Sequence, residues 1–158
     1  MFEHILIFLN ILAMGILVGK IVFLSFITAP VLSRTLDSES FARVVRNLFP
    51  PYYGLGMISA TIGWTSSIAL GLLNSYESLM LIPATLWLGI LSIEFYCRTP
   101  LIGQINELSD ELKMKESKGL NTPLLRKRRD GLHRLSVQLN SIVLLMGLCL
   151  IGLSGVSL

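Results

Sequence analysis

Among the polar side chains inside the long apolar stretches of this sequence, four are candidates for chemistry: Lys20, Ser59, Glu94 and Asn140. A charged group in the hydrocarbon of a membrane costs about 2.5 kcal/mol or more, so it is rarely left facing lipid. An ammonium, a carboxylate and an amide held together can bind a proton, an ion or a polar ligand. The same groups can also form a hydrogen-bonded ion pair that only fixes helix register. The sequence leaves both interpretations open.

Helix geometry predicts that these groups lie at a similar depth. A rise of about 1.5 Å per residue, counted from the ends opposite the basic connections, puts Lys20 and Glu94 each about 22 Å deep. Ser59 and Asn140 fall near the same level, so we expect a buried polar cluster. A third interpretation removes the cluster. In it, Lys20 extends its amine to the interface, and Glu94 pairs with Arg98 one turn further along the same helix.

A second polar stripe opens the last apolar stretch. Asp130, His133, Ser136 and Asn140 share one face of a helix, which we expect to point into the bundle or toward a partner. Histidine can ligate haem or a metal or relay a proton, although at an interface it more often only forms hydrogen bonds. The other histidine, His4, is expected at the opposite membrane surface, about 30 Å away. The two histidines therefore cannot ligate one haem iron within a chain.

Motifs of familiar enzymes are absent from the sequence. It contains no zinc-protease, c-type haem, nucleotide-binding or serine-hydrolase pattern. Cys97 and Cys149 have neither the spacing nor the neighbours of a zinc site or a disulfide framework. We therefore expect no catalytic residue, no metal and no resident cofactor, with His4 and His133 as the candidates should haem or a metal bind. A basic run suits anionic lipid headgroups, and also serves to set topology: Arg126, Lys127, Arg128 and Arg129.

The composition defines the elements that must position these residues. The 158 residues are 53% hydrophobic and 15% charged, with a mean hydropathy of +0.69. A soluble protein of this size could not bury so many apolar side chains without exposing large apolar patches. The net charge of +3 does not indicate nucleic acid, because the basic residues flank apolar stretches instead of forming one basic face. The sequence predicts a single integral membrane domain over residues 1–158.

Four apolar stretches have the length of transmembrane helices and predict an all-α, four-helix transmembrane bundle. They cover about residues 5–32, 53–73, 79–96 and 135–153, joined by cytoplasmic loops 33–52 and 97–134. The first stretch is too long for a signal peptide and is preceded by Glu3 instead of basic residues. All Lys and Arg residues except Lys20 lie in the two loops, which predicts that both termini are outside the cytoplasm. We expect a bacterial inner-membrane protein.

Each loop is expected to contain helix. Asp37 or Ser38 can cap a short amphipathic helix that ends at Pro50 and lies in the headgroup plane. Tyr52 and its neighbour Tyr53 then suit the interface where the second span begins. The loop 97–134 begins with polar and apolar residues at helical spacing, which predicts an extension of the third span into the cytoplasm.

Small residues predict close helix contacts. The first span has Gly15 and Gly19 in a GxxxG arrangement, which can pack inside the bundle or form a seam between two copies. Either arrangement requires a partner helix, from this chain, from self-association or from another membrane subunit. The second span repeats small residues every fourth position: Ser59, Gly63, Ser67 and Gly71.

Two motifs are similar to those of the transmembrane protein 205-like family, a four-span family of unsettled activity. Its pattern R-x-L…F…LFP-x-Y-[YF] resembles the first third of the chain, and its H-x-x-S-x-x-x-N resembles the entry to the last span. The resemblance implies a four-span bundle. The residues at family positions are Arg34, Phe49, Pro50, Tyr52, His133, Ser136 and Asn140.

A weaker similarity runs to four-span copper-resistance and haem-pathway membrane proteins, through His4, Gly15, Gly19 and Pro30. The haem-pathway pattern places a lysine in a later span, whereas the intramembrane lysine here is in the first. Two hypotheses follow. The first is a non-catalytic accessory subunit or assembly factor of a membrane complex. The alternative is a haem- or metal-linked redox or transport protein that uses the intramembrane polar cluster.

Overall fold

The structure, a computed structural model, describes residues 1–73 and 81–156, and these residues are helical apart from short links. Residues 2–35 pack against residues 38–73, and residues 81–117 pack against the other side of residues 38–73. The elements in chain order are α1 (Phe2–Phe23), η1 (Leu24–Thr28), α2 (Ala29–Thr35), α3 (Ser38–Leu73), α4 (Leu81–Tyr96), η3 (Cys97–Leu101), α5 (Ile102–Ser117) and α6 (Pro123–Val156).

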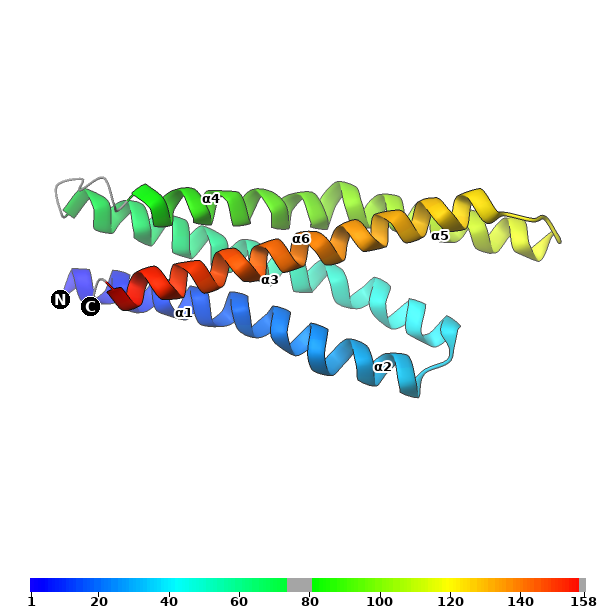
Figure 1. The fold of residues 1–158 in the computed structure, drawn as a ribbon, viewed down its shortest axis with the longest axis horizontal. Helices are drawn as coiled ribbons and strands as arrows, with labels where there is room; N and C mark the ends of the chain where they lie inside the picture. The colour runs from blue at the N-terminus through cyan, green and yellow to red at the C-terminus, as the bar shows by residue number, and fades with distance from the viewer. Residues whose placement is uncertain (74–80, 157–158) are drawn as a thin grey trace.

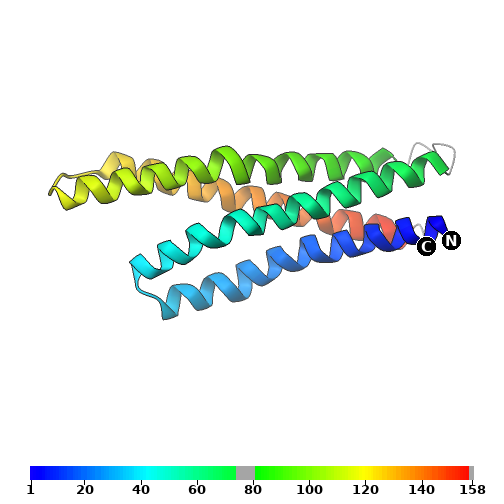
Figure 2. The ribbon, with the colours of Figure 1, turned by 180° about the vertical axis from the view of Figure 1, so that it is seen from behind.

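These elements form four long rods, and the predicted four-helix transmembrane bundle is confirmed. Each rod is long and apolar enough to cross a membrane: 2–35, 38–73, 81–117 and 123–155. The rods alternate in direction, so the start of α1, the end of α3, the start of α4 and the end of α6 lie at one end of the bundle (Figure 1). At the other end the α2–α3 hairpin diverges from the α5–α6 hairpin, and the basic residues of the two connections lie on these two arms (Figure 2).

The predicted helix end at Pro50 is wrong, because α3 continues through Pro50 and Pro51 without a break. Each proline removes one hydrogen bond to the preceding turn, but a long membrane helix held by its neighbours tolerates that loss. The amphipathic segment from Ser38 is therefore the first part of α3 and not a separate interfacial helix. The two tyrosines that follow, Tyr52 and Tyr53, are buried in the core instead of lying at the interface.

Two π-helical turns interrupt the first and third rods. η1 precedes Pro30, and η3 contains Pro100. A wider turn absorbs the hydrogen bond that a proline cannot make, so the rod bends without ending. The predicted extension of the third span is present, since α4 passes through η3 directly into α5.

Small residues of α3 let the other helices approach it closely. Gly63 lies under the indole of Trp87, and an added methyl group there would overlap the ring. Ser59 and Ser67 of the same stripe are also buried. Gly15 and Gly19 behave differently: both are exposed, and no atom of the described chain lies within 4 Å of a methyl group added to either. The GxxxG face of α1 is thus left uncovered by the bundle.

Candidate functional site

The buried ion pair between Lys20 of α1 and Glu94 of α4 is the centre of the candidate site. The ammonium nitrogen lies 2.7 Å and 2.8 Å from the two carboxylate oxygens. The Lys20 side chain is 5% exposed and that of Glu94 is 1% exposed. Lys20 therefore does not extend to the interface. Glu94 pairs with Lys20 and not with Arg98, whose guanidinium approaches the sulfur of Met57.

Helix α3 lies beside the two charged residues and leaves room for both at Gly56. A methyl group at Gly56 would overlap both the Lys20 ammonium and the Glu94 carboxylate. The ammonium donates its remaining hydrogen bond to the backbone carbonyl of Tyr52, at 3.4 Å. It also lies 4.1 Å from the centre of the Tyr52 ring, a distance typical of a cation–π contact. All three donors of the ammonium are thus engaged.

A neutral network extends the ion pair to the fourth rod. The Tyr52 hydroxyl donates to Asn140 Oδ1 at 2.9 Å, and Asn140 Nδ2 donates to the Tyr53 hydroxyl at 2.8 Å. The same amide nitrogen donates to the carbonyl of Ser136, one turn back in α6. Both the oxygen and the nitrogen of the Asn140 amide form hydrogen bonds, one to each tyrosine. These two bonds fix the orientation of the amide. The ion pair and this network together join α1, α3, α4 and α6.

A second polar cluster lies nearer the termini and contains no charge. Asn10 of α1 donates from Nδ2 to the hydroxyls of Ser66 and Ser67, at 3.0 Å and 2.8 Å, and to the Gly63 carbonyl at 3.1 Å. Asn10 is 7% exposed, so these bonds replace those that water would have made. Asn10 is not among the site residues predicted from the sequence. The signal was present, because an amide inside an apolar stretch needs partners on a neighbouring helix.

The polar stripe on α6 has an exposed part and a part that is packed into the bundle. Ser136 is buried, whereas Asp130 and His133 are exposed, and Asp130 accepts hydrogen bonds from Arg129. Of the four residues in the stripe, only Ser136 and Asn140 therefore turn into the bundle. The basic run before it is also on the surface, with Arg126 paired to Glu116 and Lys127 and Arg128 exposed.

The histidines lie far apart along the bundle. His4 is in the first turns of α1 near the chain ends, and His133 is in the part of α6 toward the basic arms (Figure 1). Across residues 1–73 and 81–156, no three His, Cys, Asp or Glu side chains are grouped so that they could hold a metal ion. Cys97 is buried beside the Lys20–Glu94 pair, and Cys149 is exposed. Neither cysteine forms a disulfide.

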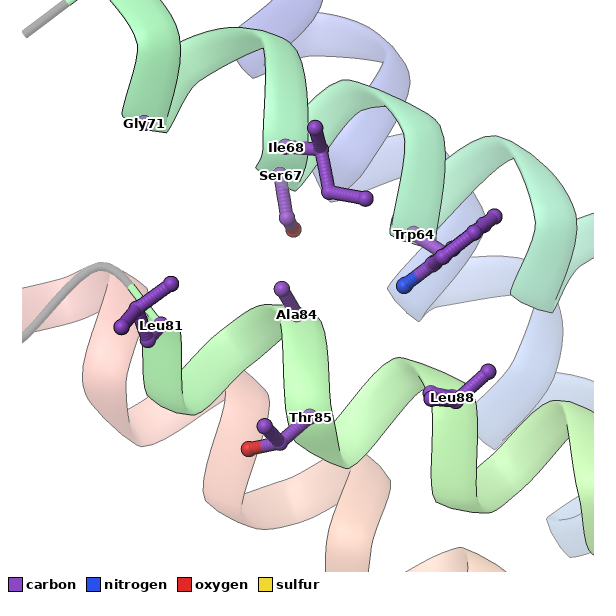
Figure 3. A pocket seen from close by; sticks show the side chains of 8 residues that line it. All are labelled: Trp64, Ser67, Ile68, Gly71, Leu81, Ala84, Thr85 and Leu88. Atoms are coloured by element: carbon purple, nitrogen blue, oxygen red, sulfur yellow. The ribbon is translucent and has the colours of Figure 1, made fainter. Parts of the chain in front are cut away.

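Two hollows border the polar groups. A groove of about 590 Å³ lies between α1 and α3, lined by Gly15, Gly19 and Lys20 from α1 and by Tyr52 from α3. A smaller cavity of about 260 Å³ lies between α3 and α4 toward the end of the bundle with the termini. In it, Ser67 points from α3 across to Ala84 on α4, and Trp64 closes one side (Figure 3).

Four apolar helices around a closed polar centre define a small multi-pass membrane protein. The chain matches, over residues 12–109, the family described as a domain of unknown function, DUF4149. Because the match covers more than half of the 158 residues, the chain belongs to this family. The matched region contains Lys20, Gly56 and Glu94 but ends before α6. No curated protein and no solved structure matches the chain. The similarities to the transmembrane protein 205-like and copper-resistance families stay predictions.

Proposed function

We propose that this protein is a non-catalytic membrane module, an accessory subunit or assembly factor that binds a transmembrane helix of a larger complex. The observation that carries the proposal is the uncovered GxxxG face of α1 beside the groove between α1 and α3. Small residues permit close backbone approach, which is the main source of helix association in lipid. A partner helix seated there would cover Gly15, Gly19 and the apolar side chains that flank them.

The ion pair supports a structural role for the polar centre. Lys20 and Glu94 satisfy each other, and Tyr52, Tyr53 and Asn140 complete their surroundings. A pair whose hydrogen bonds are satisfied fixes the register of the rods and so maintains the geometry of the docking face. The distant histidines give no comparable support to the haem-linked alternative. A Soret band in the absorption spectrum of the purified protein would favour that alternative.

The orientation of the module follows from its charges. The basic residues of the two arms, including Arg126 and Arg128, suit the anionic headgroups of a cytoplasmic leaflet. We therefore place the arms in the cytoplasm of a bacterial cell and both termini on the other side of the inner membrane. Reporter fusions at residue 1 and at residue 120 should lie on opposite sides, and a common side would contradict this orientation.

Site-specific crosslinking tests the docking face. A photoreactive amino acid at Gly19 should capture one defined polypeptide in native membranes, whereas the same group at Leu145, exposed on α6, should not. Filling the groove with Gly15→Leu should abolish the Gly19 adduct. An adduct with a second copy of this chain would indicate self-association as the module's contact. Recovery of an unmodified monomer from all sites would overturn the proposal.

A further inference from the structure

Two buried polar atoms, one from α3 and one from α4, the two helices whose contact we call the seam, have no hydrogen-bond partner in the described part of the chain. They are the hydroxyl oxygen of Ser59, a residue 2% exposed, and the indole nitrogen of Trp87, a residue 0% exposed. Buried polar groups in proteins are nearly always bonded to the protein or to ordered water. Leaving both unbonded would leave the loss of their hydration uncompensated. These atoms therefore point to bound water.

The behaviour of Ser59 contrasts with other serines of the membrane helices. Ser66, Ser92 and Ser141 each donate to the carbonyl four residues earlier, the usual arrangement inside a helix. Ser59 makes no such bond, so its hydroxyl is free to face the seam. Trp87 has no alternative of this kind, because its ring is held flat against Gly63.

The two orphan atoms lie between the two polar clusters already described. Gly56 is in contact with Glu94, and Gly63 is in contact with Trp87, so α3 and α4 run side by side through this stretch. At about 1.5 Å per residue, Ser59 is about 4.5 Å along the helix from the Glu94 level and about 6 Å from the Trp87 level. Beyond Trp87, the Gly63 carbonyl begins the Asn10 cluster.

The Asn10 cluster in turn reaches an opening. Ser67, which accepts a hydrogen bond from Asn10, also lines the cavity between α3 and α4 (Figure 3). Polar groups thus follow one face of α3 from this cavity to the buried carboxylate. The single stretch without protein partners is the one that contains Ser59 and Trp87.

We propose that ordered water binds in this stretch, held by the Ser59 hydroxyl and the Trp87 indole N–H, and connects the Asn10 cluster to Glu94. The ligand is water itself, at a site among buried residues. A buried water needs at least two polar partners, and the seam supplies them. The water gives the ion pair a route of proton exchange with the cavity near the termini. The proposal is independent of the docking face on α1.

Proton-detected solid-state NMR of the full chain in lipid bilayers tests the site. The chain has two tryptophans, so two indole N–H signals are expected, and Trp64→Phe assigns them. The Trp87 signal should receive magnetisation from water and should exchange in D2O although the ring is fully buried. A Trp87 signal with no water transfer and no exchange would mean a dry seam and would overturn the proposal.

A matched pair of variants separates bound water from slow opening of the bundle. Ser59→Thr and Ser59→Val have the same shape, but only threonine keeps the hydroxyl. Valine should slow Trp87 exchange by about tenfold relative to threonine, as expected for the loss of one hydrogen bond to the water. Water transfer to the Glu94 carboxyl should fall in the same variant. Equal exchange in the two variants would overturn the role of Ser59, and Ser59→Ala repeats the test without added bulk.

Discussion

The bundle contains two kinds of ion pair with the same geometry and different surroundings. Lys20 and Glu94 lie 2.7 Å apart with side chains 5% and 1% exposed. Arg46 and Asp110, on the arms, lie 2.8 Å apart with side chains 43% and 65% exposed. Water competes for the exposed pair and screens it, whereas the buried charges are compensated by each other and by contacts of the ammonium with Tyr52. The distance between the charges is therefore a poor guide to what each pair does.

The difference also concerns which helices each pair joins. The exposed pair links α3 to α5, where the arms diverge and few other contacts hold them together. The buried pair links α1 to α4 beside α3, and it occupies the space that a side chain at Gly56 would need. Removing one partner in the core leaves both a buried charge and a void. Removing one partner of the exposed pair leaves the other side chain in contact with water.

Breaking the buried pair should give the largest effect. Lys20→Met leaves an unpaired carboxylate and Glu94→Gln leaves an unpaired ammonium, so each should lower the free energy of unfolding by about 3–5 kcal/mol. The double variant should recover most of that loss, because neither charge remains. Unfolding in mixed micelles with increasing SDS gives the three values. Equal losses in the single and double variants would show that packing, and not charge, governs this site.

Filling the gap beside the pair should give the next largest effect. Gly56→Ala drives a methyl group into the Lys20 ammonium and the Glu94 carboxylate, and overpacking of this kind costs about 1–3 kcal/mol. Gly15→Ala is the matched control, because no atom of the described chain lies within 4 Å of the added methyl group. The same SDS titration should leave the control unchanged or slightly more stable. Comparable losses at both glycines would contradict the packing described for Gly56.

The common depth of Lys20 and Glu94 could be predicted from the sequence, because the depth of a residue along a rigid helix follows from counting residues. A rise of about 1.5 Å per residue needs no tertiary information, and it placed Lys20 and Glu94 at one level. The four spans could be predicted equally well, because the length of an apolar stretch is a local property of the sequence. The rotation of each helix about its axis could not be predicted in this way. Asn10 and the outward direction of Gly15 both depend on that rotation, which hydropathy alone does not set.

The tyrosines were misplaced for a related reason. Two consecutive prolines usually end a helix in water, so Tyr52 and Tyr53 were predicted to lie at the interface. In the bundle, α3 continues through Pro50 and carries both rings into the core, where Asn140 bonds their hydroxyls. The tolerance of proline there comes from packing against neighbouring rods, and a local pattern does not contain that information.

The exposed pair should contribute much less than the buried one. Arg46→Ala and Asp110→Ala should each change the free energy of unfolding by about 0.2–1 kcal/mol, with the effect smaller at high salt. Arg46 also donates to the Asn106 carbonyl, so its loss should exceed that of Asp110. Melting in detergent at low and high NaCl measures both. A salt-independent loss as large as that at Glu94 would remove the contrast between the two pairs.

The smallest effect should arise at Asp37, which caps α3 between the first two rods. Its carboxylate accepts hydrogen bonds from the backbone N–H of Ser40 and Glu39 and from the Ser40 hydroxyl. These bonds, the Ser40 backbone bond first, lower the pKa of Asp37 below its ordinary value. Because the folded pKa is the lower one, the stabilisation is complete above the unfolded pKa. It disappears as the pH falls through the folded value.

Hydrogen exchange in the first turn of α3 measures this local stability. Asp37→Ala should exchange faster than the wild type at neutral pH, and the difference should shrink in acid as the wild-type carboxylate is protonated. Asp37→Asn keeps a capping oxygen that does not titrate, so its difference from alanine should persist at both pH values. A wild-type advantage over alanine that is the same in acid would mean that the carboxylate charge adds nothing to the cap. The small stabilisation by the Asp37 cap would then come from hydrogen-bond geometry alone.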